Sequence, residues 1–81
     1  MLSKKEYLDL KHEVKNMCRK NVLLMISDMG LSEEESTLLL RIYDNDTKVA
    51  ISLDMNITER ALTKRTRKLF EKINDYKNTF K

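Results

Sequence analysis

The chain of 81 residues suffices for one domain. Its hydrophobic fraction of 41% is too high for a disordered tail, and its charged fraction of 36% is too high for a membrane protein. One glycine and no proline disfavour an all-β fold, and a single cysteine excludes an intramolecular disulfide. The longest apolar run, Val22 to Ile26, is far shorter than a bilayer span, so we expect a soluble cytoplasmic protein without a targeting segment.

Residues 1–30 predict a single long helix. Ser3 and Glu6 have the spacing of a capping box, in which each side chain bonds the backbone amide of the other. Gly30 stands where a left-handed residue ends a helix, and Asn16 and Asn21 are weak points where the helix can bend. Between the two ends, apolar residues recur every three or four positions and form one stripe: Tyr7, Leu10, Val14, Cys18, Val22, Met25 and Met29.

The length of this helix predicts self-association. Three shorter helices cannot cover the whole stripe, so its N-terminal part is expected to meet another chain in a homodimer. Cys18 is interpreted as a small buried hydrophobe rather than a reactive thiol. The methionines are interpreted as core residues, with a methionine-rich partner surface as the alternative. The residues expected at the dimer interface are Tyr7, Leu10, Val14 and Met17.

The next helix has an equally clear start and end. Ser32 and Glu35 repeat the capping box, and the glutamates of the first turn suit the positive end of the helix dipole. The run Asp44-Asn45-Asp46 ends the helix, because these side chains bond their own backbone. Its apolar face consists of Leu38, Leu39, Ile42 and Tyr43.

A short helix, a turn and a last helix complete the chain. Asp46 or Thr47 caps the short helix, residues 54–57 form the turn, and Thr58 caps the last helix. We therefore expect an all-α domain of four helices without strands, with a helix-turn-helix in its C-terminal half. The apolar stripe of the last helix consists of Leu62, Thr66, Leu69, Ile73, Tyr76 and Phe80.

Basic residues are concentrated on the other side of this last helix. Residues 46–81 hold nine Lys and Arg against five Asp and Glu. On a helical wheel of about 100° per residue, Arg60, Lys64 and Arg67 lie opposite the apolar stripe, and Thr63 and Lys68 flank them. A basic strip is typical of a protein that binds a polyanion, and a solvated helix face is the plainer interpretation.

The stretch from Leu31 to Ile73 resembles region 4 of bacterial sigma factors and related phage and mobile-element regulators. The shared features are the LSEEE helix start, the VAISLDM helix and turn, and the TERALTKRTRKL helix. The resemblance implies promoter-type binding of double-stranded DNA through the major groove. It places Glu59, Arg60, Thr63, Lys64 and Arg67 at the outward positions of the recognition helix. Docking of this kind turns later helical positions toward the backbone, so Lys68 and Lys72 are expected to contact phosphates.

No constellation for catalysis is present in the sequence. One histidine, His12, and one cysteine cannot supply a zinc site, and the consecutive residues Glu33, Glu34 and Glu35 point in different directions around a helix. We therefore expect no enzyme, no metal and no cofactor. Two functions stay open: a small DNA-binding transcriptional regulator, or a protein-binding module that inhibits or redirects a host protein such as RNA polymerase or a nuclease.

Overall fold

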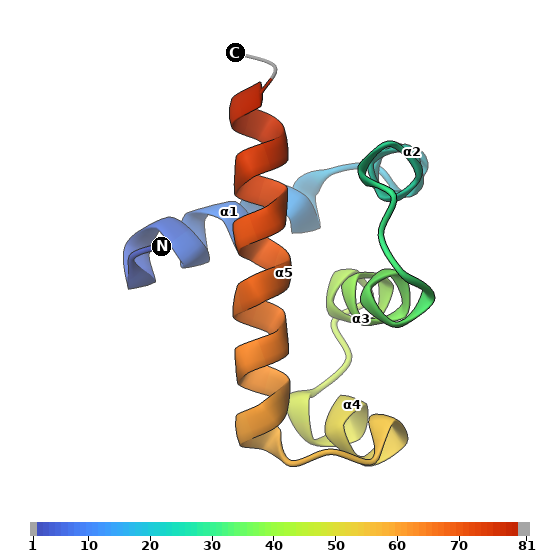
Figure 1. Ribbon diagram of the computed structural model, residues 1–81. Helices are drawn as coiled ribbons and strands as arrows, with labels where there is room; N and C mark the ends of the chain where they lie inside the picture. Colours follow the sequence, from blue (N-terminus) through green and yellow to red (C-terminus); the bar gives the residue numbers. More distant parts are fainter. Residues whose placement is uncertain (1, 80–81) are drawn as a thin grey trace.

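The computed structural model describes residues 2–79, and this part of the chain is all-helical (Figure 1). The expected all-α class is therefore confirmed, whereas the expected count of four helices is wrong. Residues 4–29 form two helices in place of one, which gives five in the described range. The helices are α1 (Lys4–Asn16), α2 (Arg19–Met29), α3 (Glu33–Tyr43), α4 (Lys48–Met55) and α5 (Glu59–Thr79).

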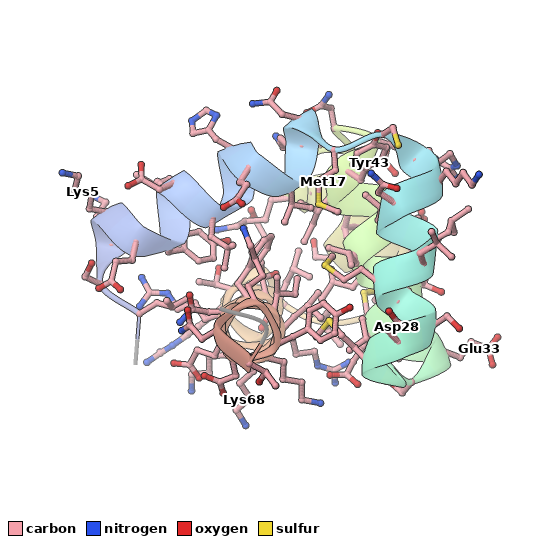
Figure 2. The ribbon with its side chains drawn as sticks, turned by 90° about the horizontal axis from the view of Figure 1, so that it is seen from above. Lys5, Met17, Asp28, Glu33, Tyr43 and Lys68 are labelled. Carbon is pink, nitrogen blue, oxygen red and sulfur yellow. The ribbon has the colours of Figure 1, made fainter. Side chains whose placement is uncertain are left out.

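The break between α1 and α2 lies at Met17 and Cys18. Both residues have extended backbone conformations, with ψ angles of 149° and 152°. The turn changes the direction of the chain between α1 and α2 (Figure 2), and Val14 on α1 and Val22 on α2 are both buried, at 1% and 0% exposure. A single straight helix would carry Val22 away from the core. The change of direction thus covers the apolar stripe inside one chain, except at Cys18.

This burial corrects two interpretations of the first stripe. Leu10 and Val14 were expected at a dimer interface, but they are buried within the chain at 6% and 1% exposure. Tyr7 and Met17 are half-buried and pack against the same core. Cys18 was expected to be buried, but it is exposed, because it stands in the turn as the residue preceding α2.

The predicted helix ends are largely confirmed. Both serine capping boxes form, at Ser3 and Ser32, and Gly30 ends α2 with φ of 64°. Thr58 caps α5 by accepting a hydrogen bond from the amide of Ala61 at 3.1 Å. Each of these signals acts within one helical turn, so the local sequence suffices to specify it.

The turn before α5 is shorter than expected. The helix α4 continues to Met55, so Asp54 is its penultimate residue, and Asn56 takes the left-handed conformation with φ of 57°. Asparagine tolerates this conformation better than other residues with a side chain. Thr47 caps the start of α4 by accepting from the amide of Ala50 at 3.1 Å.

The helix α5 is the central element of the fold. Figure 1 shows α1 crossing α5, while α2, α3 and α4 are stacked along one side of it. Tyr7 of α1 and Phe70 of α5 meet edge to face, with ring centroids 5.3 Å apart. Thr66, the polar residue in the stripe of α5, is buried with its hydroxyl donating to the carbonyl of Leu62 at 2.8 Å. Phe80, expected to end this stripe, lies outside the described residues.

None of the helices in residues 2–79 combines the length and hydropathy that a bilayer crossing requires.

The most deeply buried core residues, at most 1% exposed, come from four of the five helices of the described chain. These helices therefore share one core, which contains Val14, Val22, Leu39, Leu69, Phe70 and Ile73.

Candidate nucleic-acid interface

Four cationic side chains of α5 lie outside its buried apolar stripe. Two of them, Arg67 and Lys68, line a shallow pocket with Lys4 and Tyr7 at the start of α1. All four are exposed, and among residues 2–79 none of them forms an ion pair with a carboxylate. In the view along α5, Lys68 lies on the side of α5 opposite the middle of α1 (Figure 2). We call these four residues the outer basic face: Arg60, Lys64, Arg67 and Lys68.

Two further cations of α5 form ion pairs with α3. Lys72 donates to Glu35 at 2.6 Å, and Arg65 forms an ion pair with Glu34. Lys72 was expected to contact DNA phosphates, but its pairing with Glu35 directs it toward α3. The hydrogen bond from Lys72, followed by one from the amide of Ser32, holds the pKa of Glu35 below its ordinary value. The burial of Leu62, Leu69 and Ile73 determines which side of α5 faces inward, and the two ion pairs lie at the edge of that side.

Glu59 and Thr63 are placed differently from the four cations. Glu59 is exposed in the first turn of α5, where a carboxylate suits the helix dipole. The hydroxyl of Thr63 donates to the carbonyl of Glu59 at 3.0 Å. Thr63 itself is half-buried and lines a cavity between α1, α4 and α5. It therefore lies at the border of the outer basic face.

The cavity beside Thr63 contains a second basic cluster, which the sequence did not predict. Lys11 and Lys15 of α1 line it, and so does Lys48 at the first position of α4. Burial, followed by the positive charges of Lys15 and Lys48, lowers the pKa of Lys11. The spacing of four residues between Lys11 and Lys15 shows that they share a face of α1. Their proximity to Lys48 depends on how α1 packs.

Arg41 holds α4 in place beside α5. Its guanidinium donates to Asp46 at 2.8 Å and also donates to Asp54. One side chain of α3 therefore contacts Asp46, which precedes α4, and Asp54, which is the penultimate residue of α4. These two carboxylates raise the pKa of Arg41. The orientation of α4, and with it the entry of the chain into α5, is therefore tied to α3.

The remaining chemistry of the surface is limited. No group of three His, Cys, Asp or Glu side chains in the described range is arranged to hold a metal ion. His12 is exposed on α1. The first turn of α3, where negative charge suits the helix dipole, contains Glu33, Glu34 and Glu35. The exposed groups that suit a binding partner are therefore mainly the cations of α5, which favour an anionic partner.

Comparison of the chain with family models, curated proteins and solved structures returned no match. The resemblance of residues 31–73 to region 4 of sigma factors therefore stays a prediction.

Proposed function

We propose that the protein is a small DNA-binding transcriptional regulator of the phage or mobile-element type. In this proposal α4, the turn at Asn56 and α5 act as a helix-turn-helix, and α5 enters the major groove. The observation that supports it is the outer basic face, four cations along α5 that lack a carboxylate partner in the described chain. Such a face suits the phosphates and guanine edges of a duplex.

The rotation of α5 strengthens the proposal. Arg65 and Lys72 carry the same charge as the outer cations but are held by Glu34 and Glu35 of α3. The cations of α5 thus fall into two groups: Arg65 and Lys72, which are paired with α3, and the outer basic face, which is available to a partner. Arg60 and Lys64, in the first two turns, are the candidates for base contacts. Arg67 and Lys68 lie further along and suit phosphates.

The test is the salt dependence of duplex binding in two matched double variants. Wild-type protein is expected to bind a random-sequence duplex with a slope of log affinity against log salt of about −2 or steeper, because Arg67 and Lys68 alone supply two phosphate contacts. Arg67→Gln with Lys68→Gln, which removes the two candidate phosphate contacts, should bring the slope closer to zero by about two units. Arg65→Gln with Lys72→Gln removes the same charge from the same helix and should leave the slope near that of the wild type.

Equal effects of the two double variants would mean that only net charge matters, and the proposed docking of α5 would be wrong. Sequence specificity needs a second experiment, the selection of bound duplexes from a random pool. A defined motif among the selected duplexes is expected for a regulator. A pool that stays random would contradict sequence-specific regulation.

A second candidate function is a protein-binding module that inhibits or redirects a host protein such as RNA polymerase or a nuclease. Val49 and Leu53, one turn apart on α4, are 53% and 73% exposed, and an apolar pair of this kind favours a protein partner. In this alternative the outer basic face contacts acidic side chains. Absence of duplex binding at low salt would favour it over the DNA-binding proposal.

A further inference from the structure

A cavity of about 90 Å³ lies between α1, α4 and α5, beside the outer basic face. Three lysines from two helices line it, together with the buried side chains of Ile42, Ile51 and Leu62. A single buried water needs roughly 10–15 Å³, so the cavity has room for a polyatomic anion with some of its water. We call this place the lysine pocket, after Lys11, Lys15 and Lys48.

The charge in the lysine pocket is unbalanced. None of its three lysines forms an ion pair with a carboxylate of residues 2–79. Asp46 also lines the cavity, but it accepts a hydrogen bond from Arg41 at 2.8 Å. Burial, and after it the positive charges of Lys15 and Lys48, lowers the pKa of Lys11, so the like charges around the cavity repel one another. A bound anion would relieve this repulsion.

We propose that the lysine pocket binds a phosphate group, supplied by the backbone of the duplex that the outer basic face contacts. This inference rests on the proposed DNA binding for the source of the phosphate, but the pocket itself is defined independently. Thr63 joins the two surfaces, because it lines the pocket and lies one helical turn from both Arg60 and Arg67. Phosphates flank a helix that lies in the major groove, so a duplex presents them on the side of α5 where α1 and α4 lie.

The experiment uses the full chain and two double variants of equal charge. Lys15→Gln with Lys48→Gln removes two cations from the pocket. Lys5→Gln with Lys20→Gln removes two exposed cations from α1 and α2. Binding of a random-sequence duplex is measured against salt for each. The pocket variant should bring the salt slope closer to zero by about two units and weaken binding to all sequences alike, whereas the control should keep most of the wild-type slope.

A second arm uses inorganic phosphate as the probe. The backbone amide resonances of Lys48 and Thr63 are followed by NMR during a phosphate titration. They should shift in the wild type and stay constant in Lys15→Gln with Lys48→Gln. The Arg67→Gln and Lys68→Gln variant should keep these shifts, since its substitutions lie on the outer basic face.

The outcomes separate this inference from the proposed function. If the variant of Arg67 and Lys68 weakens duplex binding while the pocket variant does not, the pocket takes no backbone phosphate and the DNA-binding proposal stands. If the wild type binds no duplex, the proposed function fails. Phosphate-dependent shifts would then identify a site for a free phosphate ligand in place of a duplex. Absence of shifts together with an unchanged salt slope would overturn the site altogether.

Discussion

The hydroxyl of Tyr43, at the end of α3, donates a hydrogen bond of 2.5 Å to the backbone carbonyl of Met17, at the break between α1 and α2. Figure 2 shows the two residues side by side at this corner of the molecule. The bond satisfies a carbonyl that the end of α1 leaves without an intrahelical partner. It thereby links the break in the first predicted helix to the end of α3.

Tyr43→Phe removes this hydrogen bond and keeps the ring. The free energy of unfolding should fall by about 1 kcal/mol, because the carbonyl of Met17 loses its partner in a half-buried setting. Urea denaturation measures the change. Tyr7→Phe is the matched control, since the hydroxyl of Tyr7 donates no hydrogen bond to the described residues while its ring packs on Phe70. Equal losses in the two variants would refute a specific role for the Tyr43 bond.

Cys18→Ser should stabilise the protein. Cys18 has the extended backbone of a residue that caps a helix, but its side chain makes no capping hydrogen bond to α2. A serine hydroxyl can accept from an amide of the first turn, which contributes about 0.5–1 kcal/mol at such positions. Thermal unfolding followed by circular dichroism should show a melting temperature that is higher by a few degrees. Cys18→Ala is the control, and a rise of the same size there would rule out capping as the cause.

Asn56→Ala should destabilise the protein, whereas Asn56→Gly should be tolerated. The left-handed backbone at Asn56 costs a residue with a Cβ about 1 kcal/mol, and glycine adopts it freely. Gly30→Ala provides a comparison, because a Cβ there meets no atom within 4 Å and its cost comes from the backbone alone. Chemical denaturation of the three variants tests this. An unchanged stability in Asn56→Ala would show that the turn has another conformation in solution.

Lys72→Gln should reduce stability at neutral pH but not in acid. The pKa of Glu35 is lowered from its ordinary value of 4.5 in the folded state, chiefly by the hydrogen bond from Lys72. The stability that this interaction contributes is therefore complete above about pH 4.5 and is lost as the pH falls through the folded-state pKa. Because the pair is largely exposed, we expect a loss of about 0.5 kcal/mol at pH 7, which shrinks in strong acid.

The control for this prediction is Lys68→Gln, on the same helix but without a carboxylate partner in the described chain. Its effect on the free energy of unfolding should not depend on pH through the titration of Glu35. A pH dependence of the same shape in both variants would show that the Lys72–Glu35 pair does not cause it.

Arg60→Ala should cost about 1–3 kcal/mol on a selected duplex and relax the preference at one base pair, because arginine can bond guanine at two acceptors. Lys68→Ala, further along α5, should weaken selected and random duplexes alike. Fluorescence anisotropy on both kinds of duplex distinguishes base contacts from phosphate contacts. If the two variants lose affinity equally on both, then base readout by the first turns of α5 is wrong.

Much of this protein could be predicted from its sequence because the relevant interactions are local. The capping boxes at Ser3 and Ser32, the end of α2 at Gly30 and the cap at Thr58 each depend on residues three or four positions apart. The opposition of apolar and basic faces on α5 follows in the same way from helical periodicity. These features determine an all-α chain and the side of its last helix that faces outward.

The tertiary structure decided what depends on residues far apart in the chain. Whether the first stripe stays one helix or divides into two depends on the core that α3 and α5 offer, and the break leaves Cys18 exposed. Lys72 and Lys68 look alike in the sequence, but only Lys72 meets a glutamate of α3, 37 positions away. The lysine pocket likewise needs α1 and α4 to be placed around the same part of α5. Helical periodicity orients a side chain around its own axis, and only packing determines which neighbour it meets.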